Sequence, residues 1–419
     1  MTSWTPILTG DEAARAQAIA VEIADSVAAS SHVSAEEDPL RALLDAYLAK
    51  ALVSERHLDR AFDRLEAQFA QRPPHAGFGL FRGISGLAWA ATHIRALLAE
   101  WLEPADDPCD EIDEIILQLV KSAPERTSYD LISGLAGLAV YARERLPSSA
   151  AVEIWSHLVQ RLAERAERSE DGVRWWTAPE LLPDHQRKAA PNGYYNLGVA
   201  HGIPALSVVF ARAVERGIAS DLAWPLLEES VSWFGRQQLP QGTGARFPAY
   251  VPRPPGMAGS PTRQGWCYGG LGLSAALLAA ARAVGRDEWE PQAIEYARLE
   301  AGREAEETGV VDMCLCHGGA GNGHVYNRLY QATGEVIFRD AATRWLRSAL
   351  SSYDRTLGPC GFLFRRGIDG VWGPNFDFLN GSAGVALALL AASSDVTPEW
   401  DRVLMTDISP LLAAGGGSE

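Results

Sequence analysis

The stretch Cys316-His317-Gly318-Gly319-Ala320-Gly321 joins a Cys-His pair to a run of small residues that leads into a helix-like segment. Five other segments have a similar pattern. In chain order, the six motifs are Phe81-Arg82-Gly83-Ile84-Ser85-Gly86, Ile132-Ser133-Gly134-Leu135-Ala136-Gly137, Leu197-Gly198-Val199-Ala200-His201-Gly202, Cys267-Tyr268-Gly269-Gly270-Leu271-Gly272, the stretch quoted first, and Leu379-Asn380-Gly381-Ser382-Ala383-Gly384. Successive final glycines are between 49 residues (272 to 321) and 70 residues (202 to 272) apart, which leaves room for two helices and their loops. Internal repetition at this scale predicts a stacked or circular array of helical hairpins.

The hydrophobic pattern predicts two kinds of helix. Segments that follow the glycine motifs, such as residues 87–91, 135–141 and 385–392, are apolar or small almost throughout, as expected of helices buried on every side. The segments between them are amphipathic and charged, and the clearest are residues 11–28, 55–71, 152–169 and 340–352. We therefore predict an all-α fold in which a ring of outer helices surrounds a ring of inner helices.

Few segments depart from this helical pattern. Short strands are possible near residues 246–251 and 362–364. The Pro- and Gly-rich stretch at about 239–261 is the best candidate for an insertion or lid. The Gly-rich tail, residues 415–419, is expected to be flexible. We expect the rest of residues 1–419 to form a single domain.

Composition limits the possible partners. The formal net charge of −16 disfavours nucleic acid and anionic membrane surfaces, and it permits a cationic peptide substrate. The longest apolar stretch, residues 273–284, contains Arg282 and is too short to cross a bilayer. The N-terminus lacks a basic region followed by an apolar stretch, so we expect no secretory signal and a cytoplasmic location.

Cys267 and Cys316 each stand five residues before the final glycine of their motif. In a ring whose inner helices all point the same way, equivalent positions lie at one end and face a common centre. Two neighbouring repeats would then present Cys267, Cys316 and the adjacent His317 to one point. Two thiolates and one imidazole form a typical catalytic zinc set, in which the fourth position is open. The sequence therefore predicts one Zn²⁺ bound by these three residues.

The remaining candidate ligands have simpler explanations. With five cysteines in the chain, two of them in the metal-like motifs, a disulfide framework is a poor interpretation. Cys109, Cys314 and Cys360 are expected to be buried as small apolar residues. His324 is expected to be a helix residue, because a fourth protein ligand would close the zinc site.

Four motifs, in this order and at these distances, resemble the lanthionine synthetase C-like family, the lanthipeptide cyclases. The resemblance covers about residues 80–390. The motifs are Ser128-Tyr129-Asp130-Leu131-Ile132-Ser133-Gly134, Asn196-Leu197-Gly198-Val199-Ala200-His201-Gly202, Trp266-Cys267-Tyr268-Gly269 and Cys316-His317-Gly318.

The resemblance implies an α/α-toroid of seven helical hairpins, with a small insertion in some members. Only six glycine motifs are visible here, so a seventh hairpin would have to come from the N-terminal helices and the C-terminal segment. The family's zinc ligands fall on Cys267, Cys316 and His317.

The family reaction adds a peptide cysteine thiol to dehydroalanine or dehydrobutyrine, which forms a lanthionine or methyllanthionine ring. The resemblance thus implies a dehydrated precursor peptide as substrate, and a dehydratase and a transporter as possible partners in a biosynthetic complex. Zinc could hold the incoming thiol as thiolate, which is the nucleophilic form. Attack on the β-carbon then leaves an enolate that needs charge stabilisation and a proton.

The family's acid/base residues fall on His201 and Asp130, and its essential arginine and tyrosine on Arg263 and Tyr268. His201 could remove the thiol proton, protonate the enolate, or do both. Asp130 could orient His201 or cap the following turn. Arg263 could stabilise the enolate or hold Asp130, and Tyr268 could merely pack beside the metal.

Three other functions remain open from the sequence. Zinc could serve a glutathione- or peptide-thiol-binding protein that forms no rings. It could belong to another zinc enzyme on an α/α-barrel, such as a protein prenyltransferase subunit, although that enzyme would need an Asp ligand and a partner subunit. It could also be purely structural, in which case the metal would have no spare coordination position.

Overall fold

The six glycine motifs lead directly into six helices in the computed structural model, which describes residues 4–29, 38–71, 77–103, 107–254, 261–367 and 370–411. These helices are α4 (Ile84–Leu97), α6 (Leu135–Glu144), α9 (Ile203–Glu215), α11 (Gly270–Val284), α13 (Gly319–Thr333) and α15 (Ser382–Ser393). A Cβ atom on the last glycine of each motif would overlap the carbonyl group six residues earlier, as Gly272 would with Trp266. Glycine is therefore required where each loop folds back onto its own helix.

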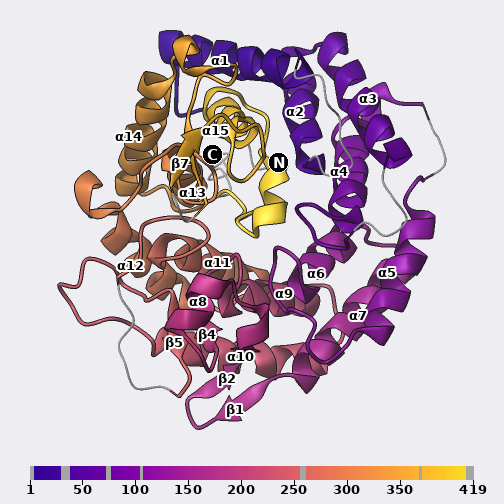
Figure 1. The fold of residues 1–419 in the computed structure, drawn as a ribbon, viewed down its shortest axis with the longest axis vertical. Helices are drawn as coiled ribbons and strands as arrows, with labels where there is room; N and C mark the ends of the chain where they lie inside the picture. The colour runs from indigo at the N-terminus through magenta and orange to yellow at the C-terminus, as the bar shows by residue number, and fades with distance from the viewer. Residues whose placement is uncertain are drawn as a thin grey trace, which may run out of the picture.

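A seventh inner helix, α2 (Ala42–Leu52), closes the ring. Each inner helix contacts the next in the order α2, α4, α6, α9, α11, α13 and α15, and α15 contacts α2. Figure 1 shows this ring viewed along the short axis of the molecule. The helix α2 has no glycine motif. Instead, Asp38 caps the preceding turn through the amide of Leu40, and most of the α2 side chains are buried.

Outer helices cover the ring. They are α1 (Gly10–Ala29), α3 (Glu55–Gln71), α5 (Asp110–Ser122), α7 (Ser149–Glu164), α10 (Ser220–Gly235), α12 (Trp289–Ala301) and α14 (Val336–Ser352). Helix α1 packs on α15, so the N-terminal helix completes the last hairpin beside the C-terminal inner helix. Within the described residues, the protein is thus an α/α-toroid of seven hairpins, as predicted.

Backbone hydrogen bonds join the loops that precede the inner helices. Leu131 N donates to Ala200 O at 3.1 Å, and Ala200 N donates to Cys267 O at 3.4 Å. Cys267 N donates to Cys316 O at 3.1 Å, and Cys316 N donates to Leu379 O at 2.9 Å. We call this series the loop belt. It places the loops of α6, α9, α11, α13 and α15 side by side at one end of the toroid.

Small sheets are attached to the ring of helices, and they correct two predictions. The helix expected at 152–169 ends at Glu164, because Glu167–Ser169 forms strand β1 and pairs with β2 (Gly172–Arg174). Strand β5 (Tyr250–Pro252), in the stretch proposed as an insertion, pairs with β4 (Tyr194–Asn196), which pairs with β3 (Trp176–Thr177). Residues 167–196 therefore also contribute strands to these small sheets, although we predicted no strand there.

Other peripheral elements are short. The helix α8 (Asp184–Ala189) lies between β3 and β4. The strand expected near 362–364 is β6 (Phe364–Arg366), which pairs with β7 (Val371–Gly373). Cys109, Cys314 and Cys360 are buried and form no disulfide, as expected. The tail predicted to be flexible, 415–419, lies outside the described residues. No helix in the described ranges is both long and apolar enough to cross a membrane.

The C-terminal segment lies inside the ring of inner helices (Figure 1), and its Asp407 contacts the last turns of α6 and α9, at the end opposite the loop belt. It includes the short helix η6 (Glu399–Leu404), and Arg143 and Arg212, from the last turns of α6 and α9, pair with Asp407. Deeper inside, Asp401 accepts hydrogen bonds from Arg328 and from His324 of α13, and all three side chains are almost fully buried. Buried ion pairs therefore hold the C-terminal segment inside the ring of inner helices.

We predict that Asp401→Asn lowers the free energy of unfolding by about 3–5 kcal/mol, because the buried Arg328 loses its counter-charge. Asp340→Asn is the control: Asp340 pairs with Arg339 on the exposed face of α14, so its loss should change stability by less than about 0.5 kcal/mol. Denaturant unfolding followed by circular dichroism measures both. Equal effects of the two substitutions would contradict this role for Asp401.

Candidate functional site

Cys267, Cys316 and His317 meet at the loop belt, as predicted. One donor atom from each lies within 4.8 Å of the others, and Cys267 Sγ is 3.9 Å from His317 Nδ1. Tetrahedral zinc, with bonds of about 2.3 Å to sulfur and 2.0–2.1 Å to nitrogen, needs donor atoms about 3.5–3.8 Å apart. The three side chains therefore fit a metal ion with little movement. Cys267 is buried, whereas Cys316 and His317 are partly exposed, so the group opens toward solvent.

The local backbone explains why these side chains converge. The bond from Cys267 N to Cys316 O fixes the two motifs in register. After Tyr268 the chain turns sharply into α11 at Gly269, whose φ of +98° disfavours any residue with a side chain. Cys267 and Cys316 thus stand just before the N-termini of α11 and α13, where the helix dipoles favour negative charge.

The two neighbouring thiols differ in pKa. The pKa of Cys267 lies well below its usual range, because Cys316 donates a hydrogen bond to it and because His317 and Arg263 add positive charge. The pKa of Cys316 is raised, first because it donates to Cys267 and second because it is buried. One thiolate is thus favoured even without a metal, and a cation would favour the second.

A second group of donors adjoins the first and shares His317 with it. Its other members are Asp312 and Cys314, both buried. Asp312 already accepts hydrogen bonds from the backbone amides of Cys314 and Arg365, and burial raises the pKa of Cys314 well above its usual range. Both oxygen atoms of the Asp312 carboxylate are therefore already hydrogen-bonded to the backbone.

His201 and Asp130 form a hydrogen-bonded pair beside the metal-ligand group. Asp130 Oδ2 lies 2.6 Å from His201 Nδ1, and Asp130 Oδ1 accepts hydrogen bonds from the amide and hydroxyl of Ser133. Asp130 thus orients the imidazole and also holds its own turn, so both of the predicted alternatives apply. The His201 side chain is 43 % exposed, which leaves Nε2 available to a substrate.

Asp130 also controls the charge of the imidazole. Burial lowers the pKa of His201, but the hydrogen bond and the negative charge of Asp130 outweigh it, and the pKa is raised overall. The pair is therefore built to stabilise a proton on His201.

Tyr268 lies between the pair and the metal ligands. Its ring centroid is 6.3 Å from that of His201, and its hydroxyl oxygen accepts a hydrogen bond from Asn196 Nδ2 at 3.2 Å. Burial raises the pKa of Tyr268, so the phenol keeps its proton and remains a donor. Asn196 stands in the motif that carries His201, yet sequence analysis gave it no role.

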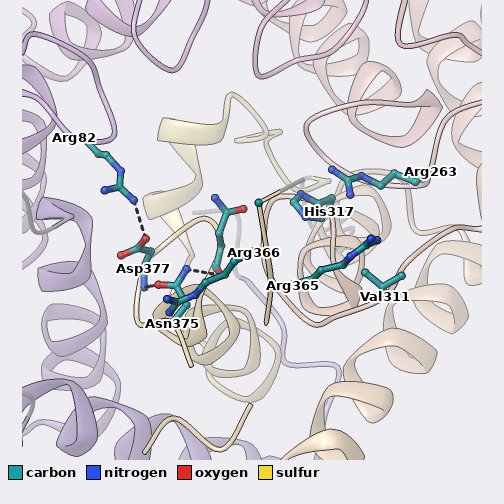
Figure 2. A pocket seen from close by; sticks show the side chains of 10 residues that line it. Arg82, Arg263, Val311, His317, Arg365, Arg366, Asn375 and Asp377 are labelled. Atoms are coloured by element: carbon teal, nitrogen blue, oxygen red, sulfur yellow. Dashed lines mark hydrogen bonds and ion pairs between the residues drawn. The ribbon is translucent and has the colours of Figure 1, made fainter. Parts of the chain in front are cut away.

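Arg263 is placed beside the candidate metal ligands. Figure 2 shows its guanidinium next to His317. Within the described part of the chain, the Asp130 carboxylate is hydrogen-bonded to His201 and Ser133. The interpretation that Arg263 holds Asp130 therefore finds no support in this geometry.

Two adjoining cavities lead away from the site. A cavity of about 570 Å³ includes His317 and Arg263 in its lining. A second, of about 350 Å³, is lined in part by Ile132 and Ser133, close to Asp130 in the chain. Both are lined by Arg82, Asp377 and Asn380. Because they share these three lining residues, the two cavities adjoin one another.

Comparison with known proteins identifies the family. The family model described as "Lanthionine synthetase C-like protein" matches residues 42–405, so the chain belongs to this family. Among solved structures, nisin cyclase superposes with a TM-score of 0.75 and 17 % sequence identity, over 93 % of this chain and 96 % of that one. A polysaccharide lyase gives a TM-score of 0.44 at 10 % identity, covering 91 % and 96 % of the two chains. No curated protein matches the sequence significantly.

The two donor groups make different predictions for metal binding. If Cys267, Cys316 and His317 hold the ion, Cys316→Ala should abolish binding of stoichiometric zinc. Cys314→Ala should retain it, because that residue belongs only to the second group. Elemental mass spectrometry of the two purified variants beside the wild type measures this. Loss of zinc in the Cys314 variant alone would assign the metal to the second group instead.

Proposed function

We propose that this protein is a zinc-dependent lanthipeptide cyclase, which adds cysteine thiols of a dehydrated precursor peptide to dehydroalanine or dehydrobutyrine. Family membership supports the reaction class. The observation that carries the proposal is the juxtaposition of a three-donor group, open to solvent, with the His201–Asp130 pair at the same end of the toroid.

Cys267, Cys316 and His317 would hold the zinc ion, which, when bound, would keep the substrate thiol deprotonated and close to the alkene. Two thiolate ligands suit this task because they neutralise the charge of the metal and leave a bound sulfur nucleophilic. His324, which follows these ligands in the chain, does not add a fourth, because it is buried in α13 and bonded to Asp401.

His201 and Asp130 would manage the proton. The addition forms a carbon–sulfur bond at the β-carbon and moves the thiol proton to the α-carbon, so the atoms balance without any further reactant. With Nδ1 bonded to Asp130, His201 Nε2 can accept the thiol proton and later deliver it to the enolate carbon. Asp130 stabilises the imidazolium between the two steps, which agrees with the raised pKa of His201.

Arg263 and Tyr268 would stabilise the enolate. The phenol of Tyr268 stays protonated and can donate a hydrogen bond to the enolate oxygen. Arg263 adds a permanent positive charge on the side of His317. Donors fixed in place before the reaction stabilise developing charge better than water, which must reorganise.

We predict that His201→Ala keeps its zinc and lowers the enzymatic rate of ring formation by about 10²–10⁴-fold, because it removes the proton carrier. His157→Ala is the control, since His157 lies on the outer helix α7 and pairs only with Glu153. Cyclisation does not change the peptide mass, so the readout is the number of thiols that iodoacetamide alkylates over time. The rate without enzyme is subtracted.

The same assay separates the cyclase from the alternative, a thiol-binding protein of the same family. A zinc-loaded wild type that binds cysteine peptides but leaves their thiols free for alkylation at the uncatalysed rate would support the alternative. Normal cyclisation by the His201→Ala variant would instead contradict the assigned proton carrier.

We also predict a shift in the pH profile of Asp130→Asn. In this account the resting His201 must be neutral to accept a proton, so kcat/KM falls as the pH drops below the pKa of His201. Asp130 raises that pKa, and its removal should move the acid limb of the profile to lower pH, with a lower maximal rate. An acid limb that stays in place or moves to higher pH would rule out this role for Asp130.

A further inference from the structure

Arginines gather in the cavity beside the metal ligands, although the whole chain carries a net charge of −16. Arg82, Arg263, Arg365 and Arg366 line this cavity together with His317. They come from three separate places: the loop before α4, the loop before α11, and strand β6. Figure 2 shows Arg365 on the side of Val311 and Arg263, and Arg366 on the side of Asn375. A concave site lined by charges of one sign focuses the electric field and attracts ligands of the opposite charge.

Among the described residues, Asp377 is the one acidic residue in the lining, and it is already paired. Asp377 pairs with Arg41 at 2.7 Å through Oδ1 and with Arg82 at 3.0 Å through Oδ2. Within the described ranges, no hydrogen bond or ion pair occupies the guanidinium groups of Arg263, Arg365 and Arg366. Three guanidinium groups therefore face the cavity without a carboxylate partner among the described residues.

The strand that carries two of these arginines is fixed to the metal-ligand region. The amide of Arg365 donates to Asp312 Oδ2 at 3.2 Å, and the backbone of Asp312 accepts a hydrogen bond from Gly319 at the start of α13. Pairing of β6 with β7 fixes the strand from its other side. The position of Arg365 and Arg366 relative to His317 is thus set by the fold.

We propose that Arg365 and Arg366, with Arg263, bind a carboxylate of the peptide substrate and so position the peptide beside the metal ligands. The inference rests on the proposed function for its substrate class, a peptide. Guanidinium groups bind carboxylates through two parallel hydrogen bonds, which gives orientation as well as affinity. The carboxylate is either an acidic side chain of the peptide or its C-terminus, since both present the same chemistry.

Binding of synthetic peptides tests this inference without turnover. Three hexapeptides each contain one cysteine and an uncharged fluorescent label at the N-terminus. The first has a free C-terminal carboxylate and no acidic side chain. The second has an aspartate and an amidated C-terminus. The third has asparagine in place of the aspartate and an amidated C-terminus, so it carries no carboxylate. Fluorescence anisotropy with the zinc-loaded protein gives the three dissociation constants.

We expect at least one carboxylate peptide to bind about tenfold more tightly than the neutral peptide. A preference for the first peptide identifies the C-terminus as the source, and a preference for the second identifies the side chain. The double substitution Arg365→Gln and Arg366→Gln should remove the preference and leave binding of the neutral peptide unchanged. The matched control is Arg339→Gln with Arg347→Gln, two exposed arginines of α14, which removes the same charge and should keep the preference.

Equal binding of all three peptides by the wild type would overturn the inference, as would a preference that survives in the Arg365/Arg366 variant. A different outcome would contradict the cyclase proposal. A zinc-loaded protein that prefers carboxylate peptides but does not accelerate ring formation keeps the carboxylate site and loses the proposed reaction. One that accelerates ring formation without any preference keeps the reaction and loses the carboxylate site.

Discussion

The loop belt is the constraint on which the site depends. Its hydrogen bonds run from Leu131 through Ala200, Cys267 and Cys316 to Leu379. The first four of these residues adjoin or are themselves candidate functional residues, so the belt sets the order Asp130, His201, Cys267 and then Cys316 with His317. The adjacent amide of Phe378 donates to Asp38 Oδ2, just ahead of α2. Ring closure by α15 and α2 therefore supports the same end of the toroid that carries the site.

The electrostatics of the two ends differ in a way that suits thiol chemistry. At the loop-belt end, helix N-termini, Arg263 and the Arg365–Arg366 pair favour anions, and the candidate chemistry there produces a thiolate and then an enolate. At the opposite end, arginines in the last turns of inner helices pair with Asp407, because helix C-termini favour cations. Asp407 therefore neutralises arginine charge at that end. At the loop-belt end, the guanidinium groups of Arg263, Arg365 and Arg366 have no carboxylate partner among the described residues.

The sequence predicted most of the helical fold and the central residues of the candidate site, because both depend on local sequence patterns. Glycine is required by close backbone approach in the loops before six inner helices, so six repeats were visible, whereas α2 follows a turn capped by Asp38 and escaped detection. The grouping of Cys267, Cys316 and His317 followed from equivalent repeat positions, whereas the pairing of Asp130 with His201 was implied by the resemblance to the family. Strands β1 to β4 and the gathering of Arg82, Arg365 and Arg366 around Arg263 were missed, since short strands and clustering of distant charges depend on tertiary contacts.

X-ray absorption at the zinc edge, with and without a cysteine peptide, tests the central claim most directly. The account predicts two sulfur ligands at about 2.3 Å, one nitrogen at about 2.0–2.1 Å and one further light atom in the free protein. Addition of the peptide should replace the light atom with a third sulfur, and the spectrum of Cys314→Ala should match that of the wild type. A closed set of four protein ligands, or a spectrum unchanged by saturating peptide, would contradict an open metal site that binds the substrate thiol.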